Sequence, residues 1–201
     1  MKKKLLFAAL LLGFAAQLSA AVGCDLKDPD RDVKRFFPGS TGYKTAYKSI
    51  DKLGGKELLQ TVEARLGDKF TGLYETIDVP YTLYTVLKGK ETIGYIHGIN
   101  QKGQYGGLQV FLAYNPQGII SDFYYQKLTS RNAKAMTAPG FAAMFKGLSF
   151  ADFKDYDPIK HTGIPAGITG EGDDFYATLR AVKKNFILVD IFVFGGKGRQ
   201  S

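Results

Sequence analysis

The sequence predicts a single α+β domain, with an antiparallel sheet of about four or more strands flanked by N-terminal and C-terminal helices. Two pairs of β-prone runs lie in the middle of the chain, each pair around a turn that contains glycine, and helical periodicity appears on both sides. The composition agrees: the 24 glycines suggest many turns, and a hydrophobic content of 45% argues against disorder. No internal repeat or long linker divides the chain.

Residues 1–23 have the pattern of an export signal peptide. Three lysines at positions 2–4 precede the apolar stretch "LLFAALLLGFAA", and small residues follow. An apolar stretch of this length is too short for a permanent transmembrane helix. We therefore expect an exported bacterial protein whose mature chain starts near residue 24.

Cys24 is the only cysteine, so it cannot form an internal disulfide in an oxidising compartment. The preceding Ala21-Val22-Gly23 resembles a lipobox, which predicts lipidation of Cys24 and a membrane-anchored lipoprotein. The alternative is ordinary cleavage near Ala21, which leaves a soluble periplasmic protein with a free thiol.

Residues 24–75 are predicted to form an N-terminal helical segment. "DLKDPDRDVKRFF" indicates a short charged helix that ends before Pro38-Gly39. "KELLQTVEARL" indicates a second helix that stops at Gly67. Four apolar residues share one face of this second helix: Leu58, Leu59, Val62 and Leu66.

Residues 76–195 form the predicted main domain, and residues 196–201 a tail. "YTLYTVLKGKETIGYIHGI" predicts a hairpin around Lys88-Gly89-Lys90. "GGLQVFLAYNPQGIISDFYYQKL" predicts two more strands around Asn115-Pro116-Gln117-Gly118, a sequence that favours a turn. The glycine-rich stretch at 148–174 is expected to be irregular.

The chain is predicted to finish with a helix that has Asp173 or Asp174 as N-cap and stops at Gly195. The end of this stretch, "FILVDIFVF", is also compatible with a strand. The helical stripe consists of Phe175, Leu179, Val182, Phe186 and Val189.

Several functional classes lack support in the sequence. The formal charge of +8 falls to about +5 without the signal peptide and is spread along the chain, which argues against nucleic acid as a partner. His97 and His161 have no matched ligands at metal spacing, and haem, zinc, hydrolase and phosphate-loop motifs are missing. No catalytic residue or metal ligand is therefore predicted.

The stretch "RNAKAMTAPGFAAMFKGL", at 131–148, predicts a helix start that faces an anion. Thr137 is suited to capping and Pro139 to the first helical turn. Three cations lie nearby in sequence: Arg131, Lys134 and Lys146.

Together, four segments of this region resemble the FMN-binding domain family over roughly residues 90–190. The family includes flavin subunits of the sodium-pumping NADH:quinone reductase and of the ion-translocating ferredoxin:NAD oxidoreductase. The matching segments are Tyr105-Gly106-Gly107, Gln117-Gly118-Ile119-Ile120, Thr137-Ala138-Pro139-Gly140 and Phe145-Lys146-Gly147.

The resemblance implies an exported FMN-binding protein that transfers electrons between redox partner proteins in the envelope or membrane. It implies that Phe141 and Tyr105 stack on the flavin, and that Lys134 and Arg131 raise its potential if they lie near the ring. The cofactor-binding residues expected from it are Tyr105, Gly106, Gly107, Thr137, Ala138, Pro139, Gly140 and Thr169.

Many family members attach FMN covalently to the last threonine of an S-G-A-T segment, and this sequence departs from that motif. Thr169 in Ala166-Gly167-Ile168-Thr169 is one candidate, and Thr178, which lies within the predicted final helix, is another. Non-covalent FMN is a third alternative. The departure also leaves open an alternative function: the chain is a non-redox accessory lipoprotein of a membrane complex, which keeps the fold without binding flavin.

Overall fold

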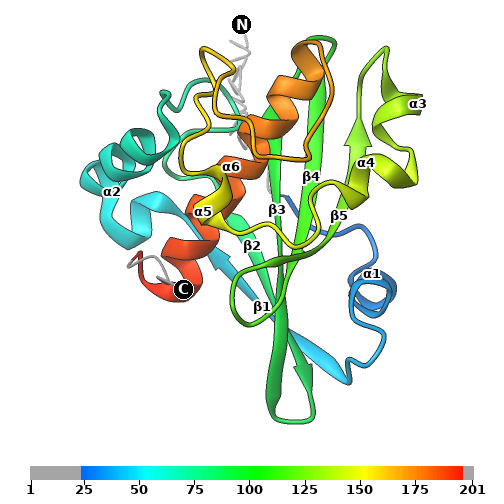
Figure 1. The fold of residues 1–201 in the computed structure, drawn as a ribbon. Helices are drawn as coiled ribbons and strands as arrows, with labels where there is room; N and C mark the ends of the chain where they lie inside the picture. The colour runs from blue at the N-terminus through cyan, green and yellow to red at the C-terminus, as the bar shows by residue number, and fades with distance from the viewer. Residues whose placement is uncertain (1–23, 197–201) are drawn as a thin grey trace, which may run out of the picture.

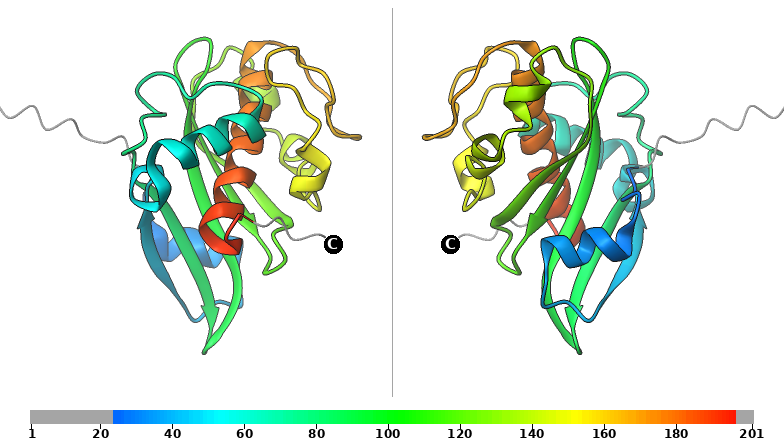
Figure 2. Two further views of the ribbon diagram at one scale, coloured as in Figure 1. Left: turned by 90° about the vertical axis from the view of Figure 1, so that its left-hand side faces the viewer. Right: turned by 90° about the vertical axis from the view of Figure 1, so that its right-hand side faces the viewer.

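The computed structural model describes residues 24–196, which form one α+β domain (Figure 1). The expected signal peptide at 1–23 and residues 197–201 of the expected tail lie outside the described residues. An antiparallel sheet of five strands forms the central layer, and helices cover both of its faces (Figure 2). The predicted fold class is confirmed.

The five strands pair in the order in which they occur along the chain, and every pair is antiparallel. They are β1 Gly42–Lys48, β2 Tyr81–Lys88, β3 Glu91–Lys102, β4 Gly107–Tyr114 and β5 Ile120–Leu128. Both predicted turns are present. Gly89 and Gly118 have φ angles of 62° and 81°, which favour glycine, and the Asn115 side chain accepts the N–H groups of Gln117 and Ile119.

The strand β1 lies in the segment for which only helices were predicted. Its sequence, GYKTAYK, lacks the regular alternation of apolar and polar residues that predicts a strand. We infer that β1 is extended because it pairs with β2. Through this pairing, the segment 24–75 contributes one strand to the sheet and belongs to the same domain as the rest of the chain.

The helix α6 (Asp173–Phe194) lies across one face of the sheet against β3 and β4 (Figure 1). Gly172 is its N-cap, so the predicted capping by Asp173 or Asp174 is wrong, and both residues occupy the first turn. Gly195 ends the helix as predicted, and the FILVDIFVF stretch is helical. All five residues of the predicted stripe are buried.

The helix α2 (Ile50–Leu66) packs against α6 and ends at Gly67, as predicted. It begins earlier than expected, because Ser49 caps a first turn that Gly54 and Gly55 separate from the rest. Val62 and Leu66 are fully buried, which confirms the predicted face.

The other face of the sheet is covered by the predicted charged helix, α1 (Pro29–Phe36), and by the residues before it. The N–H of Leu26 donates to the Tyr84 hydroxyl at 3.0 Å, and the Thr82 hydroxyl donates to Asp25 at 2.6 Å. Cys24, Leu26, Val33 and Phe36 pack in one cluster with Tyr84, Val86, Ile96, Phe111 and Ala113.

Residues 148–174 are largely irregular, as predicted, and the whole connection from β5 to α6 contains three short helices. They are α3 Ala133–Met136, α4 Pro139–Ala143 and α5 Phe150–Phe153. The segment around α4 packs on β5, where the Phe145 ring stacks on Phe123 with 4.6 Å between centroids.

Candidate functional site

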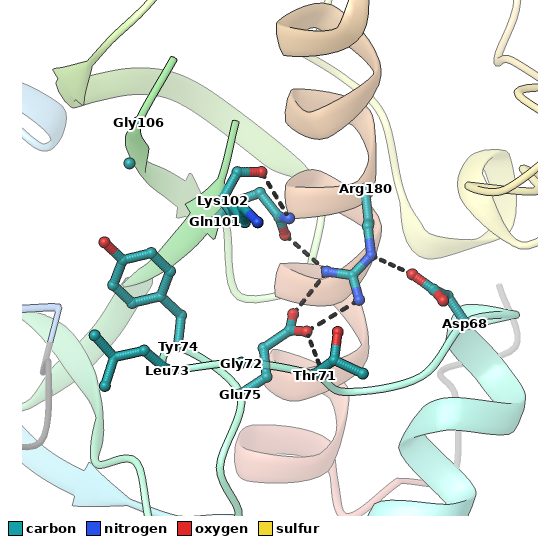
Figure 3. A pocket seen from close by; sticks show the side chains of 11 residues that line it. Asp68, Thr71, Gly72, Leu73, Tyr74, Glu75, Gln101, Lys102, Gly106 and Arg180 are labelled. Carbon is teal, nitrogen blue, oxygen red and sulfur yellow. Dashed lines mark hydrogen bonds and ion pairs between the residues drawn. The ribbon is translucent and has the colours of Figure 1, made fainter. Parts of the chain in front are cut away.

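A pocket of about 470 Å³ lies where β3 ends and β4 begins (Figure 3). Pockets that bind small molecules commonly have volumes in this range. Three parts of the chain form its wall: the loop after α2, the β3–β4 connection and α6. The lining residues are Asp68, Thr71, Gly72, Leu73, Tyr74, Glu75, Gln101, Lys102, Gly106, Gly107 and Arg180.

The guanidinium group of Arg180 forms one side of the pocket and uses all five of its N–H groups within the protein. Nε donates to Asp68 at 2.6 Å, and Nη1 donates to Glu75 at 2.6 Å and to Gln101 at 2.9 Å. Nη2 donates to the Lys69 carbonyl at 3.0 Å and to Glu75 at 3.1 Å. Arg180 therefore ties the loop after α2 to α6 and β3, and it has no N–H left for an anionic ligand.

Glu75 is the centre of this network and is 6% exposed. Besides Arg180, it accepts a hydrogen bond from the fully buried Lys184, at 2.6 Å, and one from the N–H of Thr71, at 3.0 Å. Burial alone would raise the pKa of Glu75, but attraction by Lys184 and Arg180 outweighs it and lowers the pKa to about 2. Burial also lowers the pKa of Lys184, and Glu75 offsets part of this effect.

The opposite side of the pocket carries two of the residues expected to bind FMN, Gly106 and Gly107. A Cβ on Gly107 would lie 3.1 Å from the Tyr74 hydroxyl, and one on Gly106 would lie 2.9 Å from Thr129. Leu73 is 66% exposed at the rim of the pocket. The Tyr74 hydroxyl thus packs close to the backbone at Gly107, and a side chain at this position would displace Tyr74.

The sequence reasoning missed the charged side of the pocket. Its signal was present, because Arg180 and Lys184 stand four residues apart in the predicted final helix and so share one face. Their partners Asp68 and Glu75 are more than 100 positions away, and no local pattern connects them.

The segment 137–140 lies outside the pocket lining, and all four residues are exposed. The predicted capping by Thr137 is wrong: Ala138 is the N-cap of α4, and the Thr137 hydroxyl donates to the Ala133 carbonyl at 2.7 Å. Pro139 occupies the first turn, as predicted. Because α4 has only five residues, its N-terminus offers little dipole to an anion.

Two of the three cations expected beside this helix start, Lys146 and Arg131, have other neighbours. Lys146 pairs with Asp122 at 3.0 Å. The Arg131 guanidinium lies over the Tyr105 ring, 4.6 Å from its centroid, and Tyr105 is 42% exposed. The expected residues Tyr105 and Thr137–Gly140 are therefore surface features near the pocket end of the sheet rather than parts of the pocket wall.

The two candidate threonines for covalent attachment differ in accessibility. Thr169 is exposed, and its hydroxyl contacts the Met144 sulfur at 3.6 Å, away from the pocket lining. Thr178 is fully buried in α6, where its hydroxyl donates to the Asp174 carbonyl at 2.8 Å and lies 2.6 Å from the Tyr125 hydroxyl. An enzyme would have no access to Thr178 in the folded domain.

Cys24 is 2% exposed and belongs to the cluster beneath α1. Burial raises the pKa of its thiol. Lipidation places acyl chains on this sulfur atom, so a lipidated Cys24 would have to leave the cluster. Lipidation of Cys24 stays a prediction.

The described part of the chain contains no group of three or more His, Cys, Asp or Glu side chains that could hold a metal ion. His97 is fully buried, and its Nδ1 lies 2.8 Å from Asn185 Oδ1. His161 stacks on Tyr176, with 3.9 Å between the ring centroids. The two histidines do not share a site.

Among residues 24–196, no helix has the length and apolarity needed to cross a membrane. No protein-family model matches this sequence, and no curated protein matches it significantly.

Proposed function

We propose that this chain is an exported FMN-binding electron-transfer protein of a bacterial envelope redox system, and that FMN binds in the pocket that Tyr74 and Gly107 line together with Arg180. One observation carries the proposal. The glycine pair that the family resemblance assigns to the flavin, Gly106-Gly107, lines a pocket of about 470 Å³. The pocket also offers an aromatic and an aliphatic side chain, Tyr74 and Leu73, which suit a flat ring.

Bound FMN supplies the redox chemistry, and the protein supplies position and electrostatics. Gly106 and Gly107 form one wall of the pocket. Arg180 and Glu75 hold the other wall in place through buried hydrogen bonds. Of the lining residues, Lys102 is an exposed cation with no ion pair among residues 24–196, so it is the group suited to the phosphate.

The proposal is for non-covalent binding. Thr169 is outside the pocket lining and Thr178 is buried, so neither hydroxyl lies at the proposed phosphate position. Covalent attachment at Thr169 would require the flavin to lie against Met144 and α4 instead.

The test is an FMN titration of the purified mature protein, monitored by the quenching of flavin fluorescence. Absorption spectra are recorded before and after acid precipitation of the protein. We expect bound FMN to be released into the supernatant. Gly107→Val should weaken binding at least about tenfold, because the side chain would project towards Tyr74. The matched control is Gly140→Val, which should have no effect because a Cβ there meets nothing within 4 Å.

The outcomes separate the alternatives. Flavin that stays with the precipitated protein and is lost in Thr169→Ala would establish covalent attachment and reject the pocket. Weaker binding in Gly140→Val but not in Gly107→Val would place the flavin on the 137–140 segment. A protein that neither contains nor binds FMN would reject the electron-transfer function.

A second candidate function is the non-redox accessory protein, and the charge distribution favours it. All N–H groups of Arg180 are already used, and the first turn of α6 carries Asp173 and Asp174, which repel a phosphate there. This function predicts a colourless protein that does not respond to added FMN.

A further inference from the structure

The two edges of the sheet differ at their ends: β5 has additional backbone partners at Ile120, its first residue, whereas β1 has none among the described residues. At the β5 edge, the N–H of Gly147 donates to the Ile120 carbonyl and the N–H of Ile120 donates to the Leu148 carbonyl, both at 2.8 Å. At the other edge, β1 pairs only with β2, and within residues 24–196 its backbone forms no other backbone hydrogen bond (Figure 2). Alternate residues of an edge strand direct N–H and C=O groups outward. The β1 edge therefore presents an open row of donors and acceptors.

The two faces of β1 differ in chemistry. Tyr43, Thr45 and Tyr47 lie on the α1 side of the sheet, where the Tyr43 ring packs against Tyr84 with 5.8 Å between centroids. Tyr47 is 66% exposed. Lys44, Ala46 and Lys48 alternate with these residues and so lie on the opposite face. The edge thus combines an aromatic side with a basic side.

The basic side has no internal counter-charge. Lys44 and Lys48 form no ion pair with residues 24–196. Lys44 is exposed and Lys48 is half-buried, and two more exposed lysines, Lys52 and Lys56, follow in the first part of α2. Lysines on an edge strand discourage pairing with an apolar or basic strand, but they attract an acidic one.

We propose that the β1 edge binds an extended segment of a partner protein, which joins the sheet as a sixth strand. The backbone groups of β1 would supply the hydrogen bonds. The segment would carry Glu or Asp on the face that meets Lys44 and Lys48, and β-branched or aromatic residues on the face that meets Tyr47. A second copy of this chain fits less well, because antiparallel pairing of two β1 strands gathers four lysines on one face. This inference does not depend on FMN.

The probe is a fluorescein-labelled peptide of alternating glutamate and valine, as long as β1, added to the mature protein. Fluorescence anisotropy gives the affinity, and hydrogen exchange of the backbone amides gives the location. We expect slower exchange at the outward amides of β1 when the peptide is bound. The double variant Lys44→Glu/Lys48→Glu should bind about tenfold more weakly or worse, because two attractive cross-strand pairs become repulsive.

Two controls separate the contribution of charge to peptide binding from that of the backbone hydrogen bonds. Lys127→Glu/Lys154→Glu makes the same change in net charge at exposed lysines outside β1, and it should bind like the wild type. A peptide with the same charges but alternate N-methylated amides should not bind. Thermal unfolding of both variants should match that of the wild type.

Three results would overturn the proposal. One is unchanged exchange in β1 at saturating peptide. Another is equal binding of the N-methylated peptide, which would mean that only charge attracts it. The third is self-association in sedimentation velocity that slows amide exchange in β1, which would assign the edge to a second copy of this chain.

Discussion

Replacement of Glu75 by glutamine should destabilise the domain by about 3–5 kcal/mol at neutral pH. Glutamine keeps the size of the side chain but removes the charge that both Arg180 and Lys184 face at 2.6 Å. Lys184 is fully buried, so its ammonium group would remain in the core without a counter-charge. The cost is therefore that of an unpaired buried cation rather than that of one hydrogen bond.

The same substitution should alter the response to acid. Lowering the pKa of Glu75 from 4.5 to about 2 corresponds to about 3 kcal/mol, at about 1.4 kcal/mol per pKa unit. Because the pKa of the folded state lies below that of the unfolded state, this stabilisation is fully present above about pH 4.5 and is lost as the pH falls towards 2. Glu75→Gln should lack this part of the acid-induced loss.

Urea unfolding followed by circular dichroism, at neutral pH and then from about pH 5 to about pH 2, measures both effects. The matched control is Glu57→Gln, at an exposed carboxylate of α2 with no ion pair among the described residues, which should change the free energy of unfolding by less than about 0.5 kcal/mol. Equal effects of the two substitutions at neutral pH would refute the role of Glu75. An acid response of Glu75→Gln identical to that of the wild type would refute its lowered pKa.

Three further predictions concern other buried positions. Burial lowers the pKa of His97 to about 4. Because this pKa lies below the unfolded value, the stabilisation from burying the neutral ring is complete above about pH 6.5 and is lost as the pH falls towards 4. Ring NMR signals of His97 that titrate near pH 6.5 would contradict this. The thiol of unmodified Cys24 should react with a disulfide reagent only after urea unfolds the protein, and rapid reaction of the folded protein would show that the segment leaves the sheet. Gly94→Ala should lower the free energy of unfolding by about 3 kcal/mol or more, because the new Cβ would overlap the Phe37 ring and the Tyr114 carbonyl. The control is Gly39→Ala, whose Cβ meets nothing within 4 Å and which should have little effect in the same urea assay.

Local chemistry explains which parts of the fold the sequence could predict. Gly67 and Gly195 end helices in the left-handed conformation, and Asn115 with Gly118 forms the β4–β5 turn through its own side-chain hydrogen bonds. Each of these features depends on neighbours within a few residues. The strand β1 depends on β2, which begins 33 positions after β1 ends, so its own sequence could not indicate it.

The same distinction applies to the candidate site. The resemblance predicted that Gly106 and Gly107 bind the cofactor, and these residues line the pocket. It also assigned Thr137–Gly140 to the site, but this segment lies on the surface, because the chain after β5 packs Phe141 rather than residues 137–140 against the sheet. The charged wall could not be predicted, because Arg180 and Glu75 meet only through tertiary contact.

The ion network also limits how any ligand can bind in this pocket. Because the charges of Arg180, Lys184, Glu75 and Asp68 balance one another, this side of the pocket has no net charge to offer a ligand. Affinity must then come from the side formed by Tyr74 and Gly107, and any anionic group must lie near the mouth, beside Lys102. A flavin bound in this way would have its ring inside and its phosphate towards solvent. Lys102→Gln should therefore weaken binding of FMN but not of riboflavin, and equal losses for both ligands would contradict this orientation.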